Sequence, residues 1–205
     1  VKKTGIHKGI ENQDQVIAFA ETQRLQNELN TIVTKEFIER GIPCFPCQAS
    51  DHAIMKNGRL VRLDLSAVKG LLGIGLVPTF FGVPAYDEEQ KCSILSGDQS
   101  APYVALELKA TKMIHGTNVN GVFTADPHKD KNTKHIPEIN EKNWEEIKEL
   151  LSESSAVDVT GGMLGKVTET YELARRGIKS QIIDITIEGN LKRALLGETI
   201  GTVIR

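Results

Sequence analysis

The chain has 205 residues, with 25 Lys or Arg, 27 Asp or Glu and a formal net charge of −2, so it lacks the basic excess that nucleic-acid binding requires. Hydrophobic residues make up 40% and charged residues 25%, which is typical of a soluble globular domain. No apolar run approaches the ~18 residues needed to span a bilayer, and no secretory signal is visible. We therefore expect a cytoplasmic protein with no membrane or nucleic-acid partner.

The first predicted element is a long helix over Val16–Arg40, where apolar residues recur at helical spacing and Gly41 marks the end. A strand over Pro43–Gln48 follows, and it contains Cys44 and Cys47 in a CxxC pattern. A redox pair needs a helix N-terminus, and a zinc site needs two further ligands. We therefore interpret these residues as buried strand cysteines.

The middle of the chain alternates strands with helices. The dipeptide Asn57-Gly58 favours a tight turn and predicts a β-hairpin. Five elements are predicted after it: a helix over Leu65–Gly73, a buried strand over Leu76–Phe81, a strand over Cys92–Leu95, a helix over Pro102–Leu108 with its proline in the first turn, and a strand over Lys112–Gly116.

The C-terminal part continues this alternation after a long loop. Its predicted elements are a loop over Thr117–Pro127, helices over Trp144–Leu151 and Gly165–Arg176, a strand over Ser180–Ile187, a helix over Asn190–Leu196 and a strand over Thr202–Ile204. Alternating strands and helices predict a three-layer α/β/α sandwich around a mostly parallel central sheet. Ligands usually bind at the carboxyl ends of such strands, and three glycine-bearing loops are predicted there.

The first of these loops is Ser96-Gly97-Asp98, between a strand and a helix. Gly97 lets a backbone N–H approach a ligand closely, and helix N-termini favour anions. Asp98 either caps the helix or orients lysines or a metal at a phosphate. The residues alone leave both interpretations open.

The other two loops have stronger patterns. The polar loop Thr117–Pro127 is either a plain connection or a loop that holds a nucleotide, because Asn and Asp shape turns by bonding to their own backbone. The segment Asp158–Lys166 opens a helix with two glycines, whose N–H groups and helix dipole favour a phosphate. It is not a Walker A loop, because Val167 stands where Ser or Thr is required.

Four motifs in order resemble the amino acid kinase family, and within it most closely the isopentenyl phosphate kinases. They are S-G-D at Ser96–Asp98, T-N-V-N-G-V-F-T-A-D-P at Thr117–Pro127, D-V-T-G-G-M-L-G-K at Asp158–Lys166 and the terminal G-T-V-I at Gly201–Ile204. The element Thr160–Lys166 is also similar to acetylglutamate kinase. The loop before Pro127 is similar to uridylate kinase, which lacks the T-G-G-M element.

The resemblance implies an ATP- and Mg²⁺-dependent kinase of isoprenoid biosynthesis (the alternative mevalonate pathway) that phosphorylates isopentenyl phosphate and forms a homodimer. Lys166 would hold the ATP phosphates and stabilise transition-state charge, and Asp98 would organise the active-site lysines. Ser96 and Gly97 would bind the acceptor phosphate, and no residue is assigned as a metal ligand. The nucleotide would lie among Thr117, Asn118, Gly121, Phe123, Asp126, Gly161, Gly162, Met163 and Lys166.

The resemblance also implies an organisation and some departures from the family pattern. The chain would be one domain without its N-terminal portion, which carries a glycine loop and a histidine motif. Residues 1–95 would form the acceptor-binding side, with Phe19 or its neighbours facing the isoprenoid tail, and residues 96–205 the nucleotide-binding side. The family's T-D-V-D-G appears with Asn118 and Asn120, and its Gly-Asp appears as Gly82-Val83.

Two alternatives remain open. One keeps the fold and changes the acceptor to fosfomycin or another small phosphonate. The other is a catalytically impaired homologue that binds a nucleotide without turning it over, which the two asparagines would favour.

Overall fold

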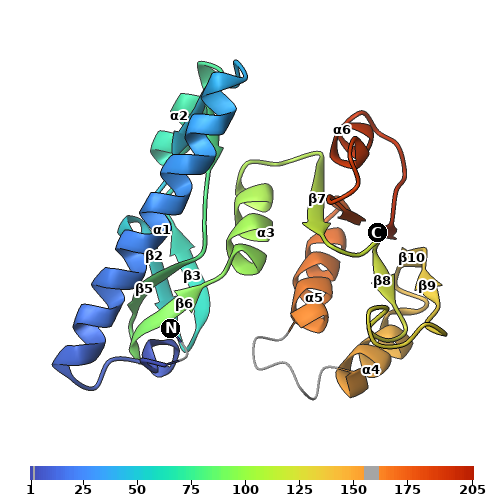
Figure 1. Ribbon diagram of the computed structural model, residues 1–205, viewed down its shortest axis with the longest axis horizontal. Helices are drawn as coiled ribbons and strands as arrows, with labels where there is room; N and C mark the ends of the chain where they lie inside the picture. Colours follow the sequence, from blue (N-terminus) through green and yellow to red (C-terminus); the bar gives the residue numbers. More distant parts are fainter. Residues whose placement is uncertain (2, 155–161) are drawn as a thin grey trace. The chain divides into compact units, whose positions relative to one another are not determined.

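Helices and strands alternate through the computed structural model, which describes residues 1, 3–154 and 162–205. The chain divides into two compact units, Val1–Val104 and Ala105–Arg205. Each unit has its own sheets and helices (Figure 1). No helix in the described part of the chain is both long and apolar enough to cross a membrane.

Unit 1 begins with the short 3-10 helix η1 (Ile6–Lys8) and the long helix α1 (Gln13–Glu39). The prediction of a long first helix is confirmed, although the helix begins three residues earlier than predicted. It begins there because Asn12 caps it: the Asn12 Oδ1 accepts the N–H of Gln15 at 3.0 Å.

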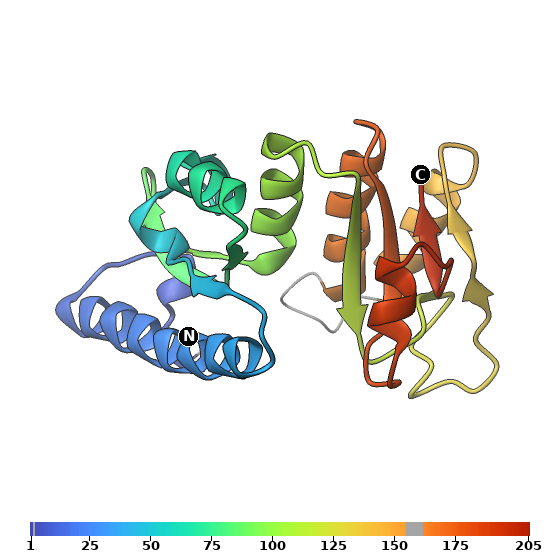
Figure 2. The ribbon, with the colours of Figure 1, turned by 90° about the horizontal axis from the view of Figure 1, so that it is seen from above.

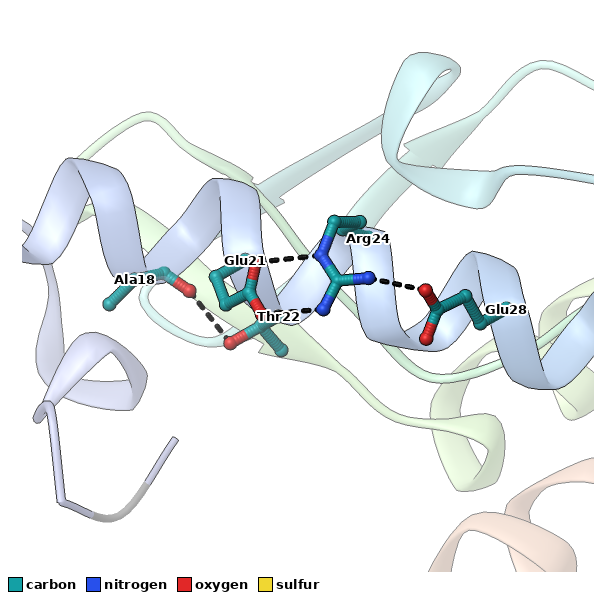
Figure 3. A network of polar contacts seen from close by, with 5 residues as sticks. All are labelled: Ala18, Glu21, Thr22, Arg24 and Glu28. Atoms are coloured by element: carbon teal, nitrogen blue, oxygen red, sulfur yellow. Dashed lines mark hydrogen bonds and ion pairs between the residues drawn. The ribbon is translucent and has the colours of Figure 1, made fainter.

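Charged pairs along one side of α1 stabilise its middle turns. Arg24 bonds to Glu21 on the preceding turn, at 2.7 and 2.8 Å, and to Glu28 on the following turn (Figure 3). Pairs three or four residues apart lie next to each other on a helix. The hydrogen bond from Arg24 holds the pKa of the Glu21 carboxyl below its usual range.

The two long faces of α1 differ in polarity. The face turned into unit 1 holds Asn30 and Thr34, which are only 5% and 6% exposed. The opposite face exposes an apolar stripe made of Ile17, Leu25, Leu29, Ile32 and Val33. The periodic apolar residues of the sequence therefore lie mostly on the solvent side of α1.

The rest of unit 1 is built mainly from short strands. Its elements are β1 (Cys44–Pro46), η2 (Ala49–Asp51), β2 (Ala53–Lys56), β3 (Arg59–Leu63), α2 (Ser66–Gly73), β4 (Val77–Thr79), β5 (Val83–Asp87) and β6 (Lys91–Leu95). A two-stranded parallel sheet joins β1 to β4, and a four-stranded sheet has the order β3-β2-β5-β6. In the four-stranded sheet only β2 and β5 are parallel, so it is less parallel than predicted.

The hairpin between β2 and β3 forms at Asn57-Gly58, as predicted. Both residues have positive φ, of 49° and 75°, which is the backbone of the tight turn that Asn-Gly favours. The interpretation of the cysteines as buried is confirmed for Cys44 in β1, whereas Cys47 follows the strand and is half-buried. Burial raises the pKa of the Cys47 thiol to about 11, so it lacks the lowered pKa of a redox thiol.

One prediction for unit 1 was wrong, and one strand was missed. The strand predicted as buried over Leu76–Phe81 is the short β4, whose Val77 is 42% exposed. The strand β5 was not predicted, because its Pro84 argues against a strand, since proline has no N–H for the sheet.

Helix α3 (Gly97–Glu107) crosses the boundary between the two units. The predicted helix over Pro102–Leu108 had its proline in the first turn, and that prediction was wrong. The helix begins at Gly97, so Pro102 is its sixth residue and lies in the helix interior.

Unit 2 contains the C-terminal strands and helices. They are β7 (Lys112–Thr117), β8 (Val122–Phe123), β9 (His135–Ile136), β10 (Glu138–Ile139), α4 (Trp144–Ser154), α5 (Gly162–Ala174), β11 (Lys179–Asp184), α6 (Asn190–Leu195) and β12 (Thr202–Ile204). The main sheet has the order β10-β12-β11-β7, and two of its three strand pairings are parallel. The strands β8 and β9 form a separate antiparallel pair.

The main sheet of unit 2 is covered on both faces. Successive residues of a strand point to opposite faces, and on β11 Ile182 packs with α4 and α5 while Ile183 packs with α6. Figure 2 shows α5 and α6 on opposite sides of these strands. Trp144 of α4 stacks on Tyr171 of α5, with ring centroids 4.2 Å apart. Unit 2 therefore has the predicted α/β/α layers.

Candidate functional site

The loop after β7 starts with a side-chain turn. The Thr117 hydroxyl donates to the Val119 carbonyl at 2.7 Å and accepts the Val119 N–H at 3.2 Å. Such hydroxyl bonds imitate a backbone turn. Thr117 therefore fixes the path of the loop at the carboxyl end of a parallel strand, where α/β proteins usually bind their ligands.

The loop continues into the β8–β9 hairpin, which was not predicted. Phe123 of β8 lies beside His135 of β9, with ring centroids 5.2 Å apart and planes tilted by 57°. Hydroxyls close the hairpin loop: the Thr124 and Thr133 oxygens are 3.1 Å apart, and Thr133 accepts the Ala125 N–H at 2.9 Å. The hairpin is therefore ordered by its own hydrogen bonds.

Asp126 shapes the tip of this loop. Its carboxylate accepts the His128 N–H at 3.0 Å and lies 3.4 Å from the Lys129 ammonium. The His128 hydrogen bond, followed by that of Lys129, holds the pKa of Asp126 below its usual range. The Asp126 carboxylate therefore holds the Lys129 ammonium at the loop tip. A positive charge held there would attract an anionic ligand.

The N-terminus of helix α5 lies near the loop that carries Asp126, and residues of both line one cavity. The helix begins at Gly162, whose φ is 39°, and Lys166 follows one turn later, half-buried. A buried polar chain anchors this turn: Thr170 donates to the Lys166 carbonyl at 2.6 Å, and its hydroxyl lies 2.9 Å from the His115 Nε2 on β7. The backbone of Lys166 is therefore tied to the main sheet.

A cavity of about 510 Å³ lies between the loop and the start of α5. This is within the usual range for small-molecule sites. Six of the residues expected around a nucleotide line it: Asn118, Gly121, Phe123, Asp126, Gly162 and Met163. Neither Thr117 nor Lys166 is among the lining residues, and Gly161 falls outside the described part of the chain. The role of these residues in nucleotide binding stays a prediction.

Sequence reasoning did not assign the other lining residues to the site. They are Val119, Ala125, Pro127, His128, Lys129, Leu151 and Leu164. The nearness of Lys129 to Asp126 in the sequence was a usable signal for a cation at the loop tip. Leu151 gave no such signal, because only the packing of α4 against α5 brings it to the cavity.

The loop assigned to the acceptor phosphate lies in unit 1. The Ser96 carbonyl accepts the N–H groups of Gln99 and Ser100, so Ser96 occupies the cap position of α3. The interpretation of Asp98 as a cap is therefore wrong: Asp98 lies in the first turn, where the helix dipole favours its charge. A Cβ added to Gly82 would lie 3.9 Å from the Gly97 nitrogen, so the loop after β4 packs beside this turn.

Two polar side chains that sequence reasoning missed hold the β2–β3 hairpin, and one of them ties it to the first turn of α3. Asp87 is fully buried and accepts four backbone N–H groups, including Gly58 at 2.8 Å and Gln90 at 3.0 Å. Gln99 accepts the Leu60 N–H and donates to the Gly58 carbonyl, both at 3.0 Å. The β2–β3 hairpin is therefore fastened to the first turn of α3.

Phe19, expected in an isoprenoid pocket, is half-buried on α1. The same face of α1 holds a buried Gln23 amide and the Asn30 Nδ2, which have no hydrogen-bond partner. This face is more polar than a pocket for a hydrocarbon tail requires. The role of Phe19 stays a prediction.

The described residues contain no group of three His, Cys, Asp or Glu side chains that could hold a metal ion. A magnesium ion that arrives with a nucleotide needs no such group, because it is bound mainly by phosphate oxygens and water with one or two carboxylates. Asp126 is the carboxylate among the residues that line the cavity.

The layers of unit 2, and a cavity between a strand-end loop and a helix N-terminus, place the chain among the α/β proteins that bind small molecules at their strand ends. The sequence model described as the amino acid kinase family matches residues 2–184. The chain belongs to the amino acid kinase family, and the resemblance stated from its motifs is confirmed.

Several known proteins are similar to most of the chain. The isopentenyl phosphate kinase of Methanothermobacter thermautotrophicus is 34% identical over 197 residues, covering 93% of this chain and 73% of the relative. That of Methanocaldococcus jannaschii is 33% identical over 186 residues, covering 91% of this chain and 67% of the relative. A solved isopentenyl phosphate kinase superposes with a TM-score of 0.84 at 31% identity, covering 99% of this chain and 77% of its own. The expected amino acid kinase fold is confirmed.

Proposed function

We propose that this chain transfers the γ-phosphoryl group of ATP to isopentenyl phosphate and so forms isopentenyl diphosphate, a step of isoprenoid biosynthesis. The observation that carries the proposal is the 34% identity to an isopentenyl phosphate kinase over 93% of the chain. The superposition on a solved enzyme of this name supports it.

The cavity of unit 2 is the proposed place of the nucleotide. Gly121 and Phe123 would flank it on one side, and the N-terminal N–H groups of α5 at Gly162 and Met163 would face its phosphates. Phosphoryl transfer depends mainly on positioning and on neutralising charge. Lys166 would supply a positive charge to the phosphates, and its anchored main chain would limit where that charge can lie.

The proposed acceptor site is the first turn of α3. The N–H of Gly97 would bind the acceptor phosphate beside Ser96, and Asp98 would orient the ammonium groups around it. The hydrogen bonds of Gln99 support this site, because they tie the first turn of α3, which begins at Gly97, to the β2–β3 hairpin. Ser96 and Gly97 lie at the junction of the two proposed sides: residues 1–95 would form the acceptor-binding side of one domain and residues 96–205 the nucleotide-binding side.

The reaction would require Mg²⁺, which neutralises phosphate charge when bound with ATP. The protein would act as a homodimer in the cytoplasm, where ATP is supplied. The dimer is supported by the apolar stripe of α1, in which Leu29 is 54% exposed and Ile32 is 59% exposed. Exposed apolar stripes of this kind often mark contacts between proteins.

A coupled assay of ADP release with Mg-ATP tests the proposal. The expected result is turnover with isopentenyl phosphate, and none with N-acetylglutamate or uridylate. Turnover with fosfomycin alone would replace the acceptor and keep the kinase, whereas ATP binding without turnover on any acceptor would indicate an impaired homologue.

A further inference from the structure

Gly201 is partly exposed and Thr202 is buried, directly beside the loop that carries Gly121. Thr202 is fully buried on β12, where it pairs with Ile182 of β11. Its hydroxyl accepts the Val122 N–H at 2.7 Å and donates to the Ile136 carbonyl at 2.5 Å. One hydroxyl therefore bonds both strands of the β8–β9 hairpin to the main sheet.

Two glycines allow this contact. Gly121 has a φ of 104°, and a Cβ there would lie 2.4 Å from the Thr202 hydroxyl oxygen. Gly201 has a φ of 67°, and a Cβ there would lie 2.1 Å from the Ile182 carbonyl oxygen. Neither position has the space or the backbone conformation for a side chain, so both glycines are needed to bring the loop against Thr202.

The residues on either side of the bonded Val122 line the cavity. Gly121 precedes it and Phe123 follows it. The His135 ring, which lies beside Phe123, is also close to this point, with its Nε2 3.4 Å from the Thr202 oxygen. A shift of Val122 would therefore move both Gly121 and Phe123, and the cavity would change shape on that side.

We propose that Thr202 is a positioning residue for the nucleotide pocket, acting through the hairpin without touching the ligand. The identity of the ligand as ATP rests on the proposed function. The anchoring of the hairpin by the Thr202 hydroxyl does not.

The test compares Thr202→Val and Thr202→Ala with Thr202→Ser. Both Val and Ala leave the buried Val122 N–H without its acceptor, whereas Ser retains the hydroxyl. Ser180→Ala is the matched control, because it removes a buried hydroxyl from the neighbouring strand that bonds the Ile178 carbonyl. Isothermal titration with a non-hydrolysable ATP analogue measures affinity, and amide hydrogen exchange at Val122 measures the anchor without any ligand.

We expect Thr202→Val and Thr202→Ala to weaken nucleotide binding by about tenfold or more, because a buried donor is left unpaired. Val122 should exchange faster by a similar factor, while amides of β7 and β11 keep wild-type protection. Thr202→Ser should stay within about twofold of wild type in both measurements, because it keeps the hydroxyl. Ser180→Ala should do so as well, because the hydrogen bond that it removes does not reach the hairpin.

If the hydrogen-exchange rate of the Val122 amide is unchanged in both Thr202→Val and Thr202→Ala, the Thr202 hydroxyl does not anchor the hairpin, and this result does not depend on the ligand. Equal losses of nucleotide affinity in Thr202→Ser and Thr202→Val would also contradict the proposal. The shape of the side chain, and not its hydroxyl, would then determine the affinity. If the wild-type chain fails to bind the ATP analogue, the proposed function fails, and hydrogen exchange still decides whether Thr202 anchors the hairpin.

Discussion

Asp87 shows at the scale of one residue how burial and hydrogen bonding compete. Burial alone would raise the pKa of its carboxyl, but the N–H groups of Gly58, Gln90 and Glu89 outweigh it and lower the pKa to about 2. An unfolded aspartate has a pKa of about 3.9. Asp87 therefore stabilises the fold fully above that value, and its contribution is lost as the pH falls toward 2.

We expect Asp87→Asn to lower the free energy of unfolding by roughly 2 kcal/mol at pH 7, and this deficit to shrink as the pH falls from 4 toward 2. Urea unfolding at several pH values measures it. Asp51→Asn, at an exposed carboxylate, is the control and should change stability little. A deficit for Asp87→Asn that stays constant from pH 7 to pH 2.5 would contradict the shifted pKa.

Lys166 is the residue to which we assign the largest catalytic effect. Removing one charge that stabilises a transition state typically lowers kcat by about 10²- to 10³-fold. We expect Lys166→Met to show a loss of this size with Tm close to wild type. Lys148→Met, on the exposed side of α4, should keep wild-type kcat. A Lys166→Met enzyme within about tenfold of wild type would remove this residue from the chemistry.

At the scale of elements, the sequence predicted those parts whose signals are local. The Asn57-Gly58 turn, the helix α1 and the alternation of strands with helices were all readable from turn chemistry and periodicity. The strand β5 and the β8–β9 hairpin were not, because Pro84 interrupts β5 and because β8 and β9 are only two residues long and are held by long-range contacts such as the hydroxyl of Thr202. The boundary of α3 was wrong because Pro102 is a strong local signal for a first turn.

Some residues of the candidate site could be predicted from local sequence patterns, and others could not. Glycine and Asn/Asp patterns in the sequence were enough to point to the loop around Gly121 and the start of α5, which both line the cavity. Leu151 could not be found, since its place at the cavity depends on how α4 packs against α5. Leu164 lies inside the segment Asp158–Lys166 but was not assigned to the site. The hydrogen bonds that link His115, Thr170 and Lys166 also depend on three-dimensional packing. They join β7 to α5, and His115 and Thr170 are 55 residues apart in the sequence.

Two glycine substitutions should have opposite effects. Gly121→Ala places a Cβ against Thr202 at a positive φ, and we expect it to lower the free energy of unfolding by about 1–3 kcal/mol and weaken ATP binding. Gly70→Ala lies inside α2 with open space around it. It should raise stability by about 0.5–1 kcal/mol, because alanine is the better helix former. Thermal unfolding compares the two, and a Gly121→Ala protein as stable as wild type would contradict the close approach.

At the scale of the whole molecule, the proposed homodimer depends on the apolar stripe of α1. We expect the wild-type chain to sediment at twice its monomer mass, and Leu25→Lys with Leu29→Lys to sediment as a monomer, because two charges would be buried in the contact. Thr31→Lys lies on the same helix and outside the stripe, so it should remain dimeric. A double variant that is still dimeric in analytical ultracentrifugation would place the contact elsewhere.

The central claim is that ATP binds in the cavity between the β8–β9 loop and the start of α5. Titrating the ¹⁵N-labelled chain with an ATP analogue, and following its backbone amide signals, tests this claim most directly. We predict the largest shifts at Gly121, Phe123, Gly162 and Met163, which line the cavity. Shifts confined to other elements, or none at saturating nucleotide, would contradict it.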